Sequence, residues 1–447
     1  MRTFFSILIL VVVVGLSADM VTVYNDNFAM VNQDIELKLS KGEKNYYFDE
    51  IPARLEPNSV IIEDNGGNFT LLAQNFEFDL AGTDRVFEKY LGKEVTIVTA
   101  DKSTFMGTMR FFDRKMIGVV DGEGVLRLIR IDEVQHAQLA KMPENFFLKP
   151  TLNWRILAKK AGNYPLNLSY LTKGMSWEAT YNGVWDNEKE ILHLSSWITL
   201  TNTSGKSFEN IDLKLMAGDV RKIHPINKNA RYRESDVILL QAGSNSMAPP
   251  PVEKEFHDYH LYTFQFPVTI NDRQTKQLKL FPDKSVKAKA IRQYRTYGKK
   301  VTSIIRFDND KKSGLGIPLP GGVFKLYQRD SDDNSSQFIG EDKIKHTPDK
   351  EEVNLTSGNA FDIVGETTVT DHRRPGKNKE QKDIKVSIRN RSKKSVNIEI
   401  MHSASYRWKI KFPTVKPERK DAYNIIFHLE LEPGEKKVIT WTEMIGY

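Results

Sequence analysis

The stretch "YLTKGMSWEATYNGVWD", residues 170–186, alternates between large apolar and polar side chains from Ser176 onward. In an extended chain one side would carry Trp177, Ala179, Tyr181, Gly183 and Trp185, and the other side would be polar except for Val184. This period of two is that of a half-buried β-strand. The aromatic side either packs in a core or binds a ligand. An uncovered aromatic strip of this size would favour aggregation, so we predict that it packs in a core.

Most other segments repeat this strand pattern. Stretches such as "EILHLSSWITLTN", "IDLKLMAGD" and "DIKVSIRN" are rich in β-branched and aromatic residues and are separated by Asn, Asp and Gly. Residues 83–91 are the one segment that reads as a short helix, and residues 132–139 suit a turn or a strand. We therefore predict an all-β protein that is built from several β-sandwich modules and has very little helix.

Residues 93–139 have a different spacing. Five short apolar segments are separated by "ADKS", "FDRK", "DGEG" and "IDEV". Five short strands in so few residues suit a small closed barrel of the SH3 or Sm kind, which removes its sheet edges by closure. We predict such a barrel over residues 89–142, inserted between larger modules.

The length of 447 residues exceeds one ordinary domain and predicts two to four modules. Around the small barrel we expect an N-terminal β module over residues 19–88, a central β-sandwich over 143–300 and a C-terminal β-sandwich over 301–447. Residues 227–255 contain "PPP" after a run of Gly, Ser and Asn, which predicts a long mobile loop within the central module.

The first residues indicate export. Arg2 precedes the apolar run "FFSILILVVVVGL", and "GLSAD" then supplies small residues for cleavage, so residues 1–18 are predicted to be a signal peptide. The run is shorter than the roughly 18 apolar residues expected of a spanning helix, although an uncleaved anchor is the alternative. The chain has no Cys, hence neither disulfides nor thiol chemistry. We expect an exported protein that is not an integral membrane protein.

The net charge of +7 is unevenly distributed. Residues 276–300 and 372–394 are both strongly basic. Such stretches can contact anionic lipid, anionic glycan or an acidic protein, or they can be solvated strand faces. Nucleic acid is not an expected partner, because an exported protein rarely meets it.

The strand around Trp197 provides the candidate binding surface. In "EILHLSSWITLTN" the side chains of His193 and Trp197 share the polar face, where a strand would normally meet water. Trp197 therefore either packs against another module or binds a ligand. Nearby cations would steer an anionic partner toward it. The candidate binding residues are Trp197, His193, Lys287, Lys289, Arg292 and Arg295.

One stretch resembles a calcium loop. In "RDSDDNSSQFIGE" the loop positions would be filled by Asp330, Asp332, Asn334, Ser336 and Glu341. However, Ser335 occupies the position that requires Gly, and the flanking residues read as strands. We therefore predict a hairpin turn and no metal site. No catalytic motif is recognisable, and we expect no cofactor.

Three successive segments carry a resemblance to a known family. They are "LSYLTKGMSWEATYNGVWD", "LHLSSWITLTNTSGKSFENIDLKLMAGDV" and "YHLYTFQFPVTINDRQTKQLKLF", and the early "YNDNFAMVNQDIELKLSKGEKNYYFDEIPARLEPNSVIIE" and late "GIPLPGGVFKLYQRD" fit the same pattern. Together they resemble the exported bacterial proteins of the domain of unknown function 4139, distant relatives of the mucoidy-inhibitor-like proteins. The resemblance implies a periplasmic or surface-facing β-protein. It implies no established enzyme activity, cofactor or catalytic residue.

These observations favour a non-catalytic envelope protein that binds or scaffolds another envelope component, either a protein or an anionic glycan or lipid surface. The alternative is a hydrolase that acts on envelope glycan through an unrecognised carboxylate pair. That alternative requires two carboxyl groups about 5 to 10 Å apart in one cleft.

Overall fold

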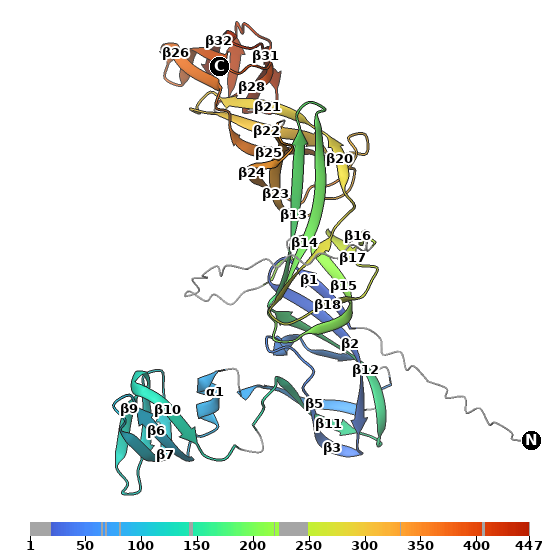
Figure 1. Cartoon of the computed structure of the whole chain (residues 1–447), viewed down its shortest axis with the longest axis vertical. Helices are drawn as coiled ribbons and strands as arrows, with labels where there is room; N and C mark the ends of the chain where they lie inside the picture. The colour runs from blue at the N-terminus through green and yellow to red at the C-terminus, as the bar shows by residue number, and fades with distance from the viewer. Residues whose placement is uncertain are drawn as a thin grey trace, which may run out of the picture.

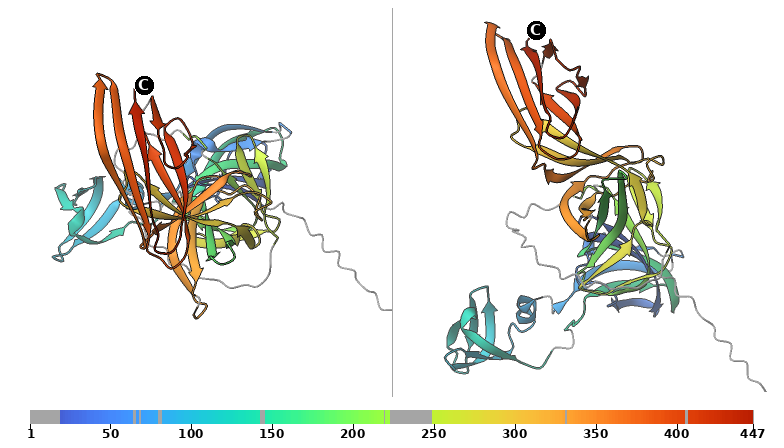
Figure 2. Two further views of the ribbon diagram at one scale, coloured as in Figure 1. Left: turned by 90° about the horizontal axis from the view of Figure 1, so that it is seen from above. Right: turned by 45° about the horizontal axis from the view of Figure 1, so that its top comes forward.

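The computed structural model describes residues 19–446 except 64–65, 68, 80–81, 143–145, 219, 223–248, 331 and 405–406. The chain forms an elongated array of β-sheets, with a small module set apart from the rest in every view (Figures 1 and 2). The predicted all-β, multi-sheet class is confirmed. Helix is confined to the short α1 (Thr83–Glu88) and the 3₁₀ turns Pro57–Ser59 and Ile131–Glu133 among the described residues. Within these residues no helix has the length and apolar character needed to cross a membrane.

The N-terminal strands belong to an eight-stranded sheet and a three-stranded sheet. The larger sheet contains β16 (Val252–Phe256), β17 (Tyr259–Thr263), β15 (Phe208–Ala217), β1 (Met20–Tyr24), β2 (Phe28–Leu39), β12 (Gly162–Lys173) and β4 (Ile61–Glu63) in spatial order, with β18 (Val268–Ile270) paired to β15. The smaller sheet has the order β3 (Gly42–Phe48), β11 (Thr151–Ala158) and β5 (Phe69–Glu77).

The central sheet is six-stranded and is built around the alternating residues 176–186. Its order is β19 (Gln274–Lys279), β14 (Ile191–Asn202), β13 (Met175–Asp186), β23 (Gly322–Arg329) and β24 (Ser336–Ile344), with β20 (Lys284–Lys287) paired to β14. β23 runs parallel to β13. A Cβ at Gly322 would lie 2.1 Å from the Ala179 carbonyl oxygen, so the close approach of these two strands requires glycine.

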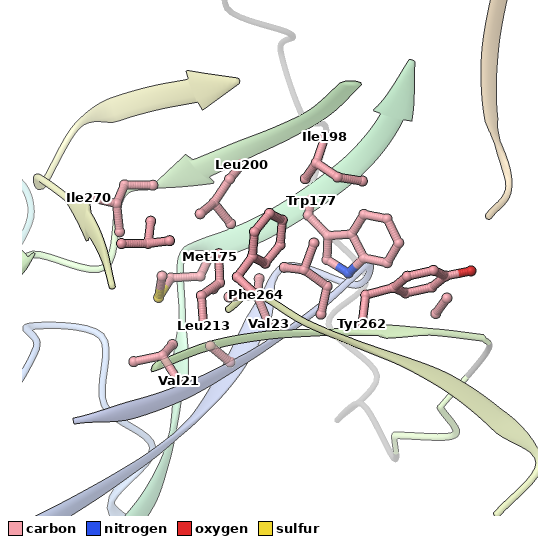
Figure 3. Close-up of a cluster of buried hydrophobic side chains, with 14 of the residues drawn as sticks. Val21, Val23, Met175, Trp177, Ile198, Leu200, Leu213, Tyr262, Phe264 and Ile270 are labelled. Atoms are coloured by element: carbon pink, nitrogen blue, oxygen red, sulfur yellow. The ribbon is translucent and has the colours of Figure 1, made fainter. Parts of the chain in front are cut away.

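The Trp–Tyr–Trp side of β13 packs in the core, as predicted. Trp177, Tyr181 and Trp185 are all buried. Trp177 lies between the central sheet and the eight-stranded sheet, among side chains from β1, β14 and β15 (Figure 3). Its indole Nε1 donates to the Met216 carbonyl oxygen at 3.2 Å, and the Tyr181 hydroxyl donates to the Pro320 carbonyl oxygen at 2.8 Å. The polar ends of these aromatic groups are thus satisfied inside the core.

The small module has the five strands that the sequence predicts. They are arranged as an antiparallel sheet in the order β10 (Val134–Leu139), β6 (Glu94–Thr99), β7 (Thr104–Phe112), β8 (Met116–Val120) and β9 (Leu126–Arg130). Its core cluster, which includes Phe87 and Met109, is separate from the two other cores. In the part of the chain that the structure describes, β9 pairs with β8 and β10 pairs with β6. Closure of this sheet into a barrel therefore stays a prediction.

The C-terminal sandwich consists of two sheets. One contains β25 (Glu352–Asn359), β22 (Val301–Asp308), β21 (Lys289–Arg295), β28 (Val396–Ser403), β31 (Asn424–Leu431) and β30 (Glu418–Arg419). The other contains β26 (Ile363–Gly376), β27 (Lys379–Asn390), β32 (Lys436–Ile445) and β29 (Trp408–Lys411). Their facing side chains, including Phe427 and Trp441, form a second core cluster.

The sheets cross the predicted domain boundaries. β1 and β2, from the predicted N-terminal module, pair with β15 and β12 of the predicted central module. β21 lies before residue 300 but pairs with β22 and β28 of the C-terminal sandwich, and β23 lies after it but pairs with β13. Non-local pairing of this kind leaves no local signal in the sequence, because strands look alike whichever sheet they join.

Two segmental predictions fall wholly or partly on residues that are not described. The predicted signal peptide, residues 1–18, lies outside the described residues. The predicted loop, residues 227–255, lies outside the described residues up to residue 248. Its last residues are strand: β16 (Val252–Phe256) forms a hairpin with β17, so the prediction of a loop is wrong at this end. The turn is made by His257, whose φ of 58° closes the hairpin.

Candidate functional site

The outward side of the central sheet is the candidate binding surface, and we call it the polar face. The inward side chains of β13 and β14 are buried, whereas the outward ones are half-buried or exposed. The strand register places on this face the residues Glu178, Thr180, Asn182 and Val184 of β13, His193, Ser195 and Trp197 of β14, Lys279 of β19, Ser285 and Lys287 of β20, Val323, Lys325 and Tyr327 of β23, and Phe338 and Glu341 of β24.

Trp197 lies near the middle of the polar face and is half-buried. Its direct cross-strand partners are Thr180 and Lys279. The Lys279 ammonium lies 4.6 Å from the indole centroid and also pairs with Asp283 at 2.5 Å. The contacts of Trp197 thus come from its own sheet. They place a partly accessible indole beside a cation.

A row of apolar and aromatic side chains crosses the same face. His193, Val184, Tyr327 and Phe338 are successive cross-strand partners on β14, β13, β23 and β24. The Tyr327 and Phe338 rings are T-shaped with centroids 5.7 Å apart, and Phe338 is 57% exposed. His193 Nδ1 lies 3.0 Å from the Ser285 hydroxyl. The polar face therefore carries two accessible aromatic sites among hydroxyl, amide and ammonium groups.

A cleft of about 820 Å³ continues the polar face at the end of the β13–β14 hairpin. Lys189, Ile191 and Lys287 line it from the central sheet, and Lys289, Arg306 and Glu399 line it from the C-terminal sandwich. Lys287 and Lys289, two of the predicted steering cations, thus meet in one cleft. The lining also contains acidic side chains such as Glu352, so the cleft has mixed charge.

The centre of the cleft is an ion pair that is largely withdrawn from water. Arg306 Nη1 and Nη2 donate to Glu399 Oε1 and Oε2 at 2.6 and 2.9 Å, and Arg306 Nε lies 3.5 Å from Glu352 Oε2. Gln293 Nε2 donates to Glu399 at 3.4 Å. Burial raises the pKa of Glu399, but the hydrogen bonds and charge of Arg306 outweigh this effect and leave the pKa below its usual value. Glu399 is therefore ionised at neutral pH.

This ion pair predicts a pH-dependent contribution to stability. Because the pKa of Glu399 is lower in the folded state, the pair stabilises the fold above the unfolded-state pKa of about 4.3, and the contribution is lost as pH falls through the folded-state pKa. Glu399→Gln is expected to destabilise the protein at neutral pH and to differ little from wild type in strong acid. Denaturation at pH 3 to 7 measures this difference. A constant difference over that range contradicts the prediction.

The two remaining predicted cations do not join the cleft. Along β21 side chains alternate, so Arg292 lies on the opposite side of the sheet from Lys289. Burial there lowers the pKa of the Arg292 guanidinium. Arg295 is exposed at the far end of β21, opposite Met401 of β28. Of the four candidate cations, Lys287 and Lys289 therefore line the cleft and Arg292 and Arg295 do not, because the period of a strand separates residues that are close in sequence.

The metal-like loop is a hairpin turn, as predicted. The Asp330 N–H donates to the Ser335 carbonyl oxygen at 2.8 Å, and Asn334 has a φ of 59°. The Asp330 carboxylate accepts from the Asp332 N–H at 2.9 Å, so it caps the turn. Glu341 lies well along β24, opposite Lys325. Among the described residues no cluster of three or more His, Cys, Asp or Glu side chains could hold a metal ion.

Sequence reasoning missed a second buried pair of polar side chains, in the C-terminal core. His402 Nε2 lies 2.5 Å from Glu443 Oε2, and both side chains are almost fully buried. His402 Nδ1 contacts the Thr296 hydroxyl at 2.8 Å. The available signal was a charged residue inside an apolar run, as in "VITWTEMI" for Glu443 and "NIEIMHS" for His402 and Glu399. Such residues need a partner, although the sequence does not identify which one.

Searches against models of protein families, curated proteins and solved structures find no match to this chain. The resemblance to the exported family with the domain of unknown function 4139 therefore stays a prediction that rests on the sequence motifs alone.

Proposed function

We propose that this protein is an exported, non-catalytic protein of the bacterial cell envelope that binds an acidic envelope glycan on the polar face. The observation that carries the proposal is the position of Trp197, half-buried on the polar face of the central sheet and in contact with Lys279. The elongated array of sheets suits a scaffolding role, since it places this face between two further β-modules (Figure 1).

The chemistry of the polar face suits an acidic sugar chain. Pyranose rings present apolar faces that pack on aromatic side chains such as Trp197 and Phe338. Hydroxyl and amide groups between them, such as those of Ser195 and Asn182, can exchange hydrogen bonds with sugar hydroxyls. Lys279 beside Trp197 and Lys287 toward the cleft can pair with uronate carboxylates. The long extended face also fits a linear polymer better than a small metabolite.

The hydrolase alternative is not favoured by the cleft. Glycoside hydrolysis needs one carboxylic acid that stays protonated near neutral pH and a second carboxylate close to it. Glu399 and Glu352 do lie close together, but Arg306 contacts both. The lowered pKa of Glu399 is opposite to that of a general acid. Arg306, Glu352 and Glu399 belong to one sheet of the C-terminal sandwich, and their contacts link its strands.

Titration with polygalacturonate, a linear polyuronate, tests the proposal. Trp197→Ala is expected to weaken binding about tenfold, equivalent to about 1.4 kcal/mol, and Lys287→Glu is expected to weaken it most at low salt. Phe412→Ala, which removes an aromatic side chain that is 82% exposed elsewhere, is the matched control and should have no effect. Equal binding by the wild type and Trp197→Ala would overturn the assignment.

A photoreactive residue at position 197 gives an independent readout in cells. A glycan adduct at this position supports the proposal. A specific protein adduct would keep the face as the binding surface but replace the glycan with a protein partner. Crosslinks confined to the chain itself would show that Trp197 has only a structural role.

A further inference from the structure

The small module has a second surface that the proposed function does not use, and we call it the apolar face. Met106 and Phe111 of β7 and Leu126 and Leu128 of β9 are 67%, 39%, 49% and 57% exposed. They lie on the side of the sheet opposite the core, which Met109 and Ile129 occupy. Single exposed apolar residues are ordinary, but four on one sheet face mark an interaction surface.

The register makes these side chains contiguous. Gly118 of β8 is paired with Phe111 on one side and with Leu128 on the other. A Cβ at Gly118 would lie 2.3 Å from the Phe111 ring, so the ring rests flat over the glycine. Val120, in the next row, pairs with Leu126. The register thus joins Phe111, Leu128, Val120 and Leu126 into one apolar surface across three strands.

Basic residues border this surface. Arg110 precedes Phe111, and Arg114 and Lys115 form the turn between β7 and β8, all three of them exposed. The one acidic residue of the same turn, Asp113, accepts hydrogen bonds from the N–H groups of Lys115 and Met116, at 2.7 and 2.8 Å. At this end of the surface the basic residues outnumber the acidic one, whereas the turn between β8 and β9, at the Leu126 end, carries Asp121 and Glu123. The apolar side chains and the basic turn between β7 and β8 together complement an anionic lipid surface, which offers acyl chains beneath negative headgroups.

The module is able to present this face independently of the rest of the chain. Its core is a separate cluster, and it stands away from the other sheets in all views (Figures 1 and 2). The two connections to it are joined at Asp79, which accepts from the Phe147 N–H at 2.7 Å and pairs with Lys89 at 3.4 Å. These contacts hold the two connecting segments together at Asp79, and the apolar side chains of the module are exposed.

We infer that the apolar face of the small module docks on an anionic lipid bilayer, with Met106, Phe111, Leu126 and Leu128 in the headgroup–acyl boundary and Arg114 and Lys115 at the phosphates. This inference does not depend on glycan binding by the polar face. Together the two surfaces would connect a membrane to a glycan.

Co-sedimentation of the mature chain, without residues 1–18, tests the inference. The vesicles are phosphatidylcholine alone or phosphatidylcholine with about 30% phosphatidylglycerol. Leu126→Glu/Leu128→Glu should reduce partitioning into the anionic vesicles about tenfold or more. Arg114→Glu/Lys115→Glu should reduce binding to these vesicles and should not affect neutral ones. Phe361→Glu changes an apolar residue that is 96% exposed elsewhere and should bind as wild type does.

Other results of these experiments would contradict the inference. Absence of vesicle binding, or equal binding by wild type and Leu126→Glu/Leu128→Glu, would overturn the inference. A dimer that light scattering detects for the wild type but not for this variant would also overturn the inference, provided that vesicles do not dissociate the dimer. A second copy of the chain would then cover the apolar face. Circular dichroism confirms that the exposed substitutions leave the fold intact.

Discussion

Replacing Glu443 with alanine is expected to lower the free energy of unfolding by about 3–5 kcal/mol, and replacing His402 should have a similar effect. Both side chains are almost fully buried between β28 and β32, with Nε2 and Oε2 only 2.5 Å apart. Rings of Trp441, Trp408 and Tyr297 lie around His402, with centroids 5.0, 6.0 and 5.5 Å away. Water has little access to this site, so a single substitution leaves the remaining partner unpaired in the core.

A double-mutant cycle measured by urea denaturation with tryptophan fluorescence checks this prediction. The double variant His402→Ala/Glu443→Ala should lose less stability than the sum of the two single losses, because neither polar side chain is left in the core without its partner. Replacement of the pair by His402→Leu/Glu443→Met should recover part of the loss. Single variants that each lose less than about 1 kcal/mol would show that the pair makes no special contribution.

The second large effect is expected at Trp177. Trp177→Ala should cost about 3–5 kcal/mol, since it removes the largest side chain between the eight-stranded sheet and the central sheet. It also leaves the Met216 carbonyl oxygen without the indole N–H that donates to it at 3.2 Å. Trp177→Phe, which keeps most of the apolar volume, provides a measurement if the alanine variant does not fold.

Trp197→Ala is the matched control for Trp177→Ala. The two indoles lie on adjacent strands of one sheet, but Trp177 is 3% exposed and Trp197 is half-buried on the polar face. A substitution on that face should change stability by roughly 1 kcal/mol or less. Similar large losses at both positions would mean that Trp197 is a core residue, and the polar face would then lose its principal binding residue.

The sequence by itself determined the strand content and the direction in which most side chains point. The period of two in β13 and β14 placed Trp177 in the core and Trp197 outside it, because neighbouring side chains on a strand point to opposite sides. The same reasoning identified the five strands of the small module and the hairpin turn at Asp330. These features depend on residues within a few positions of one another.

Only the tertiary structure decided which strands become neighbours. Arg306 and Glu399 meet although 93 residues separate them, and His402 meets Glu443 across 41 residues. Strand pairing also placed β20 in the central sheet and β21 in the C-terminal sandwich, so that the cleft lies between them. Strand pairing is satisfied by backbone groups that every residue shares, so the sequence specifies alternation strongly and partner choice weakly. The binding surfaces of this protein depend on that choice of partner.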